Sequence, residues 1–321
     1  MLDITFVSGL VETIYDISPV ETESIQRYTL DWRGIFWIRE ENGQRWVLRL
    51  IKHADAAKNF RATATFLGWL NQLGYPAPSV RLTRNQQLVG IRGDWTMLLL
   101  SFIEGKGITP EPFDLRLLSA RLGQLHALDH NSAPAIRLSR CHPETIATHT
   151  IPQLDAGIRS APEMYIPLFK SLYDSMSALL HKETLPLGIT HGDCWYMNAI
   201  KTDKGEVYLI DWNNVGIGTL VLDLGYLLLS SHFRLEYPFC IEPHPDVIQP
   251  ILEGYQVHYL SQEEIRYLLP AVHFLLVFQL GEYYENNETL QKDDPFLAKI
   301  QLRFNHAATI AQMAETYVGY H

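Results

Sequence analysis

Basic residues are scarce in this chain. It has 26 Lys and Arg against 36 Asp and Glu, which gives a formal net charge of −10. Binding to a nucleic-acid backbone needs a net or local excess of Lys and Arg, so this balance argues against a nucleic-acid partner. The negative charge mildly favours a cationic or neutral partner, although acidic solvated surfaces are common in proteins that have no such partner.

Cysteine is also scarce, and the three residues Cys141, Cys194 and Cys240 are far apart and show no C-x-x-C spacing. They predict neither a disulfide framework nor a zinc site, and free thiols fit a reducing cytoplasm. No basic segment precedes an apolar run at the N-terminus, so we expect no secretory signal. The apolar stretches are far shorter than the ~20 residues of a membrane span, so we expect no membrane association.

Hydrophobic residues are abundant at 47%, and their pattern changes along the chain. The first hundred residues are rich in strand signals, with Asn42-Gly43 as a hairpin turn. We expect a short helix at 3–16, a longer helix at 55–73, and strands at 35–40, 45–51, 79–83 and 94–103. Helical patterns dominate after Glu104-Gly105-Lys106-Gly107, at 113–128, 162–182, 221–231, 248–259, 262–284 and 300–318. The sequence thus predicts an α+β protein with a β-rich lobe at 1–103, containing one main helix, and a larger helical lobe at 104–321.

The stretch HGDCWYMN at 191–198, followed by LIDW at 209–212, places polar residues between apolar segments. Two short strands joined by a turn at 202–205 would put Asn198 opposite Ile210 or Asp211, with Cβ atoms about 4.5–5.5 Å apart. An amide oxygen and a carboxylate can share one Mg²⁺, which usually takes only one or two protein ligands and completes its shell with phosphates and water. The pattern favours a metal–nucleotide site over a calcium cage.

Asp193 precedes this hairpin, and Gly192 before it allows a tight turn. An Asp at this place can accept the proton of a hydroxyl group or orient that hydroxyl. The order Asp193, Asn198 and Asp211 matches the arrangement of a catalytic-loop Asp, a metal-binding Asn and a second metal-binding Asp in kinases.

The combination of HGDCWYMN, VYLIDW and VLDLGYLLL resembles the aminoglycoside phosphotransferase and choline kinase family, which has a two-lobed protein-kinase-like fold. WVLRL at 46–50, GYPAP at 74–78 and LGQLHAL at 122–128 are similar to other parts of that family. The resemblance implies ATP- and Mg²⁺-dependent transfer of the γ-phosphoryl group to a hydroxyl of a small molecule. An aminoglycoside-type antibiotic, choline, homoserine and a sugar all fit as acceptors, and no pattern indicates an oligomeric state.

Carried over to this sequence, the resemblance implies Asp193 as catalytic base, Asn198 and Asp211 as Mg²⁺ ligands, and His191 as a structural residue of the loop. Asp223 is similar to an Asp that braces this loop; the alternative is an acid that only favours a helix N-terminus.

The ATP contacts follow from the same resemblance. Residues Ser101, Phe102 and Ile103 correspond to the hinge whose backbone meets adenine, and Arg49 stands at the strand position of the usual phosphate-binding Lys.

Three features depart from the family pattern. Arg49 replaces the Lys, although Arg can bind phosphate bidentately. The following helix has no Glu, and Phe66 stands roughly where that Glu is expected. Only Gly34 represents the glycine-rich loop. These departures favour an alternative function, a pseudokinase-like module that binds a small molecule or nucleotide with weak or no catalysis. The retention of Asp193, Asn198 and Asp211 together favours an active enzyme over that alternative and over a coincidental match.

Two further features have open interpretations. Cys194 follows the proposed base directly and is interpreted as a small loop residue, because no His and Asn set supports a thiol nucleophile. Glu282 and Glu285 in EYYENNE at 282–288 could hold a substrate amine, as acids of the helical lobe do in the related antibiotic kinases, or form a solvated helix end.

Overall fold

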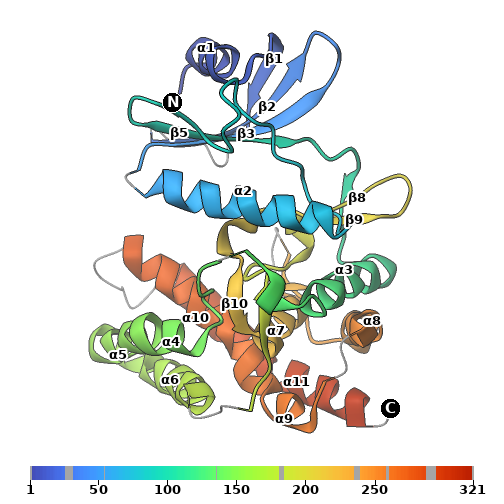
Figure 1. Ribbon diagram of the computed structural model, residues 1–321. Helices are drawn as coiled ribbons and strands as arrows, with labels where there is room; N and C mark the ends of the chain where they lie inside the picture. The colour runs from blue at the N-terminus through green and yellow to red at the C-terminus, as the bar shows by residue number, and fades with distance from the viewer. Residues whose placement is uncertain are drawn as a thin grey trace. The chain divides into compact units, whose positions relative to one another are not determined.

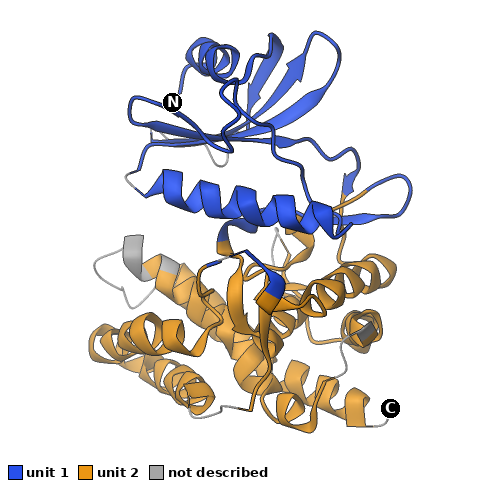
Figure 2. Cartoon of the chain, in the orientation of Figure 1, with its two compact units in different colours: residues 1–106, 132–136, 202–213 blue, residues 107–131, 137–201, 214–321 orange. Residues whose placement is uncertain are grey.

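The computed structural model describes residues 2–25, 32–53, 55–134, 136–180, 184–234, 239–257, 260–286 and 294–319. The chain divides into two compact units, coloured separately in Figure 2. Unit 1 contains residues 1–106, 132–136 and 202–213, and unit 2 contains residues 107–131, 137–201 and 214–321. The single boundary at residue 103 stays a prediction of the sequence.

Unit 1 is built on a five-stranded antiparallel sheet with the strand order β1-β2-β3-β5-β4 (Figure 1). Helices α1 and α2 lie on its opposite faces. The elements are α1 (Ile4–Tyr15), β1 (Pro19–Ser24), β2 (Arg33–Glu40), β3 (Arg45–Ile51), α2 (Ala56–Gln72), β4 (Gly90–Arg92) and β5 (Trp95–Ser101). The predicted helices at 3–16 and 55–73, the hairpin of β2 and β3, and strand β5 are confirmed.

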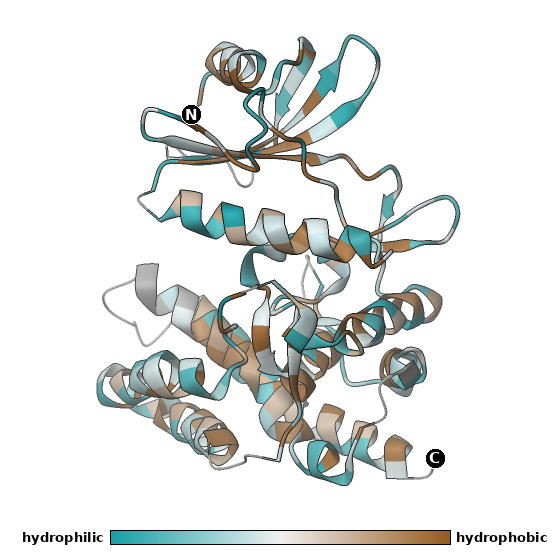
Figure 3. Ribbon diagram, in the orientation of Figure 1, coloured by the Kyte–Doolittle hydropathy of each residue, from teal (hydrophilic) through white to brown (hydrophobic). Residues whose placement is uncertain are grey.

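The hairpin of β2 and β3 forms because its turn chemistry and its side-chain pattern agree. Gly43 has a φ of 83°, the left-handed conformation for which glycine has no steric penalty. Buried and half-buried residues alternate along β3, so one face of the strand meets a core. Figure 3 shows the contrast between the hydrophilic residues at this turn and the hydrophobic run of β5, the next strand in the sheet.

The predicted strand at 79–83 is wrong. Only an isolated bridge joins Val80 to Leu100 there, and Pro76 and Pro78 just before it lack the N–H groups that a longer ladder needs. The sheet instead gains β4 and β1 as its two outer strands, and neither has the alternating apolar pattern of a half-buried strand.

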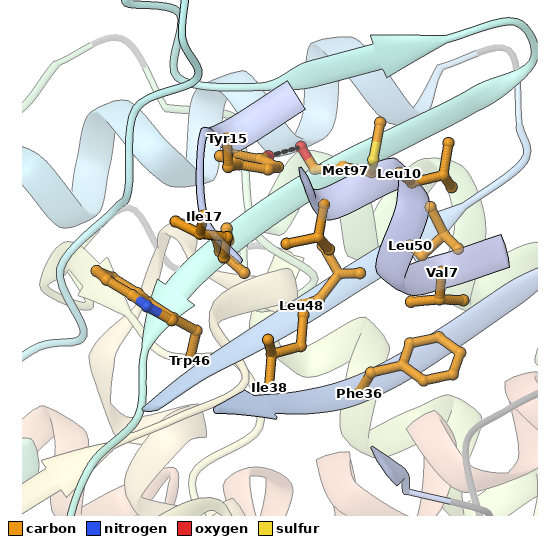
Figure 4. Close-up of a cluster of buried hydrophobic side chains, with 12 residues drawn as sticks. Val7, Leu10, Tyr15, Ile17, Phe36, Ile38, Trp46, Leu48, Leu50 and Met97 are labelled. Carbon is orange, nitrogen blue, oxygen red and sulfur yellow. Dashed lines mark hydrogen bonds between the residues drawn. The ribbon is translucent and has the colours of Figure 1, made fainter. Parts of the chain in front are cut away.

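Helix α1 closes the core on one face of this sheet (Figure 4). Val7 and Leu10 point from the helix toward Phe36, Leu48 and Leu50 of the strands. The last residue of the helix, Tyr15, is buried and donates its hydroxyl hydrogen to the carbonyl oxygen of Met97 at 3.0 Å. Removal of this apolar surface from water fixes the sheet from which Arg49 projects.

A second apolar cluster of unit 1 surrounds Phe66 on α2. The Phe66 ring is fully buried and lies with its centroid 5.8 Å from the ring of Trp212. Tyr75 meets the same Trp212 edge-on at 6.2 Å. Trp212 is therefore a packing residue, and it fixes the segment that contains Asp211.

Unit 2 is largely helical. Its helices are α3 (Pro112–His126), α4 (Pro143–Thr145), α5 (Ile151–Ser160), α6 (Ile166–Leu180), α7 (Leu220–Ser230), α8 (Pro245–Gly254), α9 (Gln262–Arg266), α10 (Leu268–Asn286) and α11 (Pro295–Gly319). Strand β7 (Leu187–Thr190) pairs with β10 (Gly216–Thr219) in this unit, which also contains β8 (Ala199–Lys201). The other two short strands are β6 (Lys106–Gly107), at the end of the first segment of unit 1, and β9 (Val207–Leu209), in unit 1. The strands predicted on either side of the turn at 202–205 are confirmed as β8 and β9.

The helical predictions for unit 2 differ from the structure in two places. The single helix predicted at 262–284 is two helices, because Tyr267 leaves the helical conformation between α9 and α10. The sequence analysis also missed helix α5. Within the described parts of the chain, no helix combines the length and the apolarity needed to cross a membrane.

Helix α7 is the centre of unit 2, and every one of its residues is buried. It packs closely against α10 at Gly225, where a Cβ atom would lie 2.3 Å from the backbone carbonyl carbon of Ala271. No side chain larger than hydrogen fits at this contact. The close packing fixes the helix that carries Asp223 and Tyr226, two residues three positions apart and thus on one face.

The cluster around Phe66 generates a stability prediction. Phe66→Glu supplies the carboxylate that the family pattern expects in this helix, but it buries that charge against Trp212 without a partner. We expect the free energy of unfolding to fall by at least about 3 kcal/mol, measured by urea denaturation. The matched control is Thr65→Glu at the exposed neighbouring position, which should change stability by less than about 0.5 kcal/mol. Equal stability of the two variants would contradict the packing role of Phe66.

Candidate active site

The loop at residues 191–198 follows directly from β7, whose pairing with β10 fixes its starting point. Thr190 pairs with Gly216, so the chain leaves the ladder at His191. Gly192 has a φ of 74°, and a Cβ atom there would lie 2.6 Å from the carbonyl oxygen of Asn214. This position requires glycine because of both its conformation and the close approach of the backbone.

Asp223 binds this loop through both oxygens of its fully buried carboxylate. Oδ2 accepts the backbone N–H of His191 at 2.6 Å, and Oδ1 accepts the backbone N–H of Gly192 at 3.0 Å. Hydrogen bonds to a carboxylate are among the stronger ones in proteins, and these two come from adjacent residues. Asp223 thus holds the turn that presents Asp193, in addition to its place in the first turn of α7.

His126 is the side-chain partner of Asp223. Its Nε2 atom lies 3.3 Å from Oδ2 of Asp223, and its Nδ1 atom contacts the hydroxyl of Tyr255. Burial acts to raise the pKa of the Asp223 carboxyl, but the hydrogen bond and the charge of His126, together with His191, hold that pKa below its usual value. His126 is therefore a hydrogen-bonded packing residue, and it helps to keep Asp223 ionised.

Asp193 is half-buried at the end of this turn. Its Oδ1 atom accepts the hydroxyl hydrogen of Tyr226 at 2.5 Å. Asn198 donates from its Nδ2 atom to the backbone carbonyl of Asp193 at 3.0 Å. This bond fixes the orientation of the amide and commits its nitrogen, so the amide oxygen is the atom suited to a metal ion.

Cys194 is buried and free. Burial, with the charges of Asp223 and Asp193, raises the pKa of its thiol well above the ordinary value. A thiolate would be the reactive form, so this cysteine is a small loop residue rather than a nucleophile.

Unit 1 contains the other predicted site residues, and it brings two of them together. Nη1 of Arg49, on β3, lies 3.3 Å from Oδ1 of Asp211, and the guanidinium lies over the ring of Phe60 at 5.7 Å. Asp211 has a φ of 60°, an uncommon conformation for a non-glycine residue that occurs often at functional sites. Phe66 occupies the position on α2 where the family pattern leads us to expect a Glu. Arg49 contacts Asp211 instead of an acid on this helix.

The predicted hinge residues lie at the end of β5. Ser101 donates its N–H to the carbonyl of Ser79 at 2.8 Å, and Phe102 donates its N–H to the carbonyl of Arg45 at 3.2 Å. The guanidinium of Arg45 also stacks over the Phe102 ring at 4.1 Å. Two of the three hinge N–H groups are thus used within unit 1, which leaves the N–H of Ile103 as the donor to be considered for a ligand.

Sequence reasoning missed one residue of this site. Tyr226, the partner of Asp193, lies three residues after Asp223 in VLDLGYLLL, and this helical spacing was the available signal. The side chains of Glu282 and Glu285, considered above for binding an amine, lie outside the described residues.

The comparisons with known proteins agree with this geometry. A sequence model of the phosphotransferase enzyme family matches residues 24–267, which include every predicted site residue. The chain therefore belongs to that family, and it is a small-molecule kinase that phosphorylates a hydroxyl group. The search of curated proteins found no match.

Solved structures of similar fold include three small-molecule kinases. An amicoumacin kinase in complex with AMP-PNP, Ca²⁺ and its antibiotic superposes with a TM-score of 0.70 at 15% identity, over 98% of this chain and 94% of that one. A microcompartment-associated aminopropanol kinase gives 0.69 at 15% identity, over 99% and 98%. A spectinomycin phosphotransferase in complex with ADP and spectinomycin gives 0.65 at 15% identity, over 98% and 99%. At these identities the likeness shows the protein-kinase-like fold alone.

The lowered pKa of Asp223 predicts how stability depends on pH. A carboxylate whose folded pKa lies below its unfolded value of about 3.9 stabilises the fold fully above about pH 5. That contribution is lost as the pH falls through the unfolded and then the folded pKa. We expect Asp223→Asn to lower the free energy of unfolding by about 2–3 kcal/mol at pH 7, and the difference from wild type to shrink below pH 4.

Urea denaturation at a series of pH values measures this difference. Asp203→Asn, an exposed carboxylate in the turn at 202–205, serves as the control and should follow wild type throughout. A constant difference between Asp223→Asn and wild type down to pH 3 would contradict the role of the ionised carboxylate.

Proposed function

We propose that this enzyme transfers the γ-phosphoryl group of ATP, with Mg²⁺, to a hydroxyl group of a small molecule. The observation that carries the proposal is the construction around Asp193. Its loop is held by two backbone hydrogen bonds to Asp223, and its carboxylate is oriented by Tyr226. A carboxylate so held is suited to accept a hydroxyl proton, because phosphoryl transfer depends on positioning and on stabilisation of charge.

Asp193 acts as the base or as the group that orients the acceptor. Tyr226 donates to Oδ1, so Oδ2 is the oxygen that receives the hydroxyl proton. The acceptor oxygen forms a bond to the γ-phosphorus, the bond from that phosphorus to the β–γ bridging oxygen breaks, and ADP leaves. General-base assistance of this kind typically contributes a factor of about 10²–10⁴ to the rate.

Asn198 and Asp211 are the residues that would hold Mg²⁺. The donors that they offer fit this ion: a carboxylate oxygen from Asp211, and an amide oxygen from Asn198, whose nitrogen is committed to Asp193. Among the residues that the structure describes, no three His, Cys, Asp or Glu side chains gather into a metal cluster. A magnesium ion with few protein ligands is typical of sites where nucleotide phosphates complete the shell, and there the ion neutralises charge on the phosphates.

Arg49 is the proposed phosphate contact, and Ile103 the proposed adenine contact. The side chain of Arg49 is only 14% exposed, and its guanidinium forms an ion pair with the carboxylate of Asp211. Because Arg presents several N–H groups in a planar fork, it can keep one contact to an acid and direct others at a phosphate. The Ile103 N–H serves as donor to adenine, since those of Ser101 and Phe102 are used within unit 1.

The base assignment is tested by Asp193→Ala. We expect turnover, measured as ADP release in the presence of an alcohol that the wild type phosphorylates, to fall at least about a hundredfold. Affinity for ATP, measured by calorimetry, should stay close to wild type, because Asp193 contacts the acceptor rather than the nucleotide. Asp203→Ala, at an exposed carboxylate in a turn, is the control and should keep full turnover. Wild-type turnover in Asp193→Ala would remove the assignment.

The metal assignment is tested by Asp211→Asn. Loss of the charged oxygen ligand should weaken binding of ATP in the presence of Mg²⁺ by about tenfold or more, and should change binding without Mg²⁺ much less. Calorimetric titration with and without the ion measures both. Identical Mg²⁺ dependence in the variant and wild type would contradict the assignment, and no nucleotide binding by the wild type would favour the pseudokinase-like alternative.

A further inference from the structure

A cavity of unit 2 lies beside the proposed base. It has a volume of about 250 Å³, below the usual range of pockets for drug-sized ligands. Tyr226 lines the cavity, and its hydroxyl donates to Asp193. A molecule in the cavity would therefore contact a residue that is hydrogen-bonded to the proposed base. The lining residues are Trp195, Tyr196, Tyr226, Ser230, Phe233, Arg234, Gln279, Phe296, Lys299 and Arg303.

The described lining of this cavity is positively charged. Arg234, Lys299 and Arg303 are the charged residues among the ten described lining residues, and none of these ten carries a carboxylate. Within the described parts of the chain, no ion pair joins any of these three cations to an acid. This cluster is unusual in a chain with a net charge of −10.

Arg303 is the most deeply buried of the three, with only 4% of its surface exposed. Its Nη1 atom donates to Oε1 of Gln279 at 2.7 Å, and its guanidinium lies 3.5 Å over the ring of Phe233. Its Nε atom is buried and has no hydrogen-bond partner among the described residues. Burial lowers the pKa of this guanidinium to about 10, so it stays charged at neutral pH. A buried charge costs free energy unless an opposite charge compensates it, and a bound anion in the cavity supplies that compensation.

Lys299 adds a second cation on the same face of α11, one helical turn before Arg303. Like charges at this spacing destabilise a helix, and both burial and the charge of Arg303 lower the pKa of Lys299. Phe296, three residues before Lys299, lines the cavity too, so one stripe of α11 faces the ligand space. This stripe lies outside residues 24–267, the segment matched by the family model.

Arg234 completes the set. Its Nη1 atom donates to the carbonyls of Ser231 and Phe233 at 3.1 and 2.7 Å. These bonds fix the side chain at the cavity wall and neutralise none of its charge. The remaining surface is aromatic, with the rings of Trp195 and Tyr196 5.4 Å apart. Such a pocket combines an apolar wall with a localised positive charge.

We infer that the acceptor alcohol carries an anionic group, a carboxylate or a phosphate, which Arg303 and Lys299 bind in this cavity while the hydroxyl group reaches Asp193. The inference rests on the proposed function, because it concerns the acceptor of that same reaction. It reverses the expectation of a cationic or neutral partner drawn from net charge. The local field at the site, rather than the total charge, selects the ligand.

The test compares small probes that differ in charge. Calorimetry measures binding of glycerate, glycerol 3-phosphate, glycerol and ethanolamine to the full chain. We expect glycerate or glycerol 3-phosphate to bind and glycerol and ethanolamine to bind at least about tenfold more weakly. The probe that binds more tightly shows whether the acceptor alcohol carries a carboxylate or a phosphate group.

Variants connect this binding to the cavity. Arg303→Gln and Lys299→Gln should each weaken the anionic probe about tenfold or more, and Arg303→Lys should recover part of the loss. Lys170→Gln, an exposed cation on α6, is the matched control and should bind like wild type. Thermal unfolding checks that each variant is folded. If Arg303→Gln is unstable, the Lys299→Gln variant, at a half-buried position, still tests anion binding.

Three results would overturn the inference: no binding of either anion, equal binding by wild type and Lys299→Gln, or preference for ethanolamine. The last result is expected if Glu282 or Glu285 holds an amine. Titration with ATP and Mg²⁺ separates this outcome from failure of the proposed function. If the protein binds the nucleotide but neither anion, the inference of an anionic acceptor is wrong and the proposed kinase function stands. If it binds an anion through Lys299 but shows no nucleotide binding or turnover, the proposed kinase function is wrong.

Discussion

The loop at residues 191–198 depends on one buried carboxylate. Asp223 is fully buried in α7, and it accepts hydrogen bonds from the backbone N–H groups of His191 and Gly192. His126 lies against the same carboxylate and stabilises its negative charge. Burial of an ion is costly, and here backbone hydrogen bonds and a histidine offset that cost. The same helix carries Tyr226 to Asp193, so α7 both fixes the turn of the loop and orients its carboxylate. Since α7 is itself locked against α10 at Gly225, the position of Asp193 follows from core packing.

The departures from the family pattern in unit 1 have a common physical explanation. Phe66 fills its position on α2 with an aromatic ring packed on Trp212, so no acid fits there without burying an unpaired charge. The arginine on β3 then contacts Asp211, an acid of the site itself. A guanidinium tolerates this arrangement better than an ammonium group does, because its planar fork has further N–H groups for a phosphate. The substitution of Lys by Arg and the loss of the helix Glu therefore belong together.

Charge is distributed unevenly over the molecule. The chain as a whole is acidic, yet the lining residues that the structure describes for the cavity beside Asp193 include three cations and no carboxylate. Burial of the Arg303 charge costs free energy, which the hydrogen bond to Gln279 and the ring of Phe233 offset in part and the anion inferred above would offset further. On that inference, a few side chains of α11 and of the segment after α7 select the acceptor. Kinases of the same fold can differ in this region while they keep the catalytic loop.

The sequence by itself determined the class of fold and the candidate site loop, because both depend on local signals. The hairpin at Asn42-Gly43, the helix at 56–72 and the spacing of Asp193, Asn198 and Asp211 are patterns within a few residues of chain. The strand expected at 79–83 failed because prolines and a single bridge, rather than β propensity, decide its pairing. Only the tertiary structure brought Tyr226 to Asp193 and Arg49 to Asp211, and only it placed Arg303 and Tyr226 in the wall of one cavity of unit 2. These pairs are 33, 162 and 77 positions apart in the sequence. No local pattern encodes which distant side chains lie together, because packing of the whole core decides it.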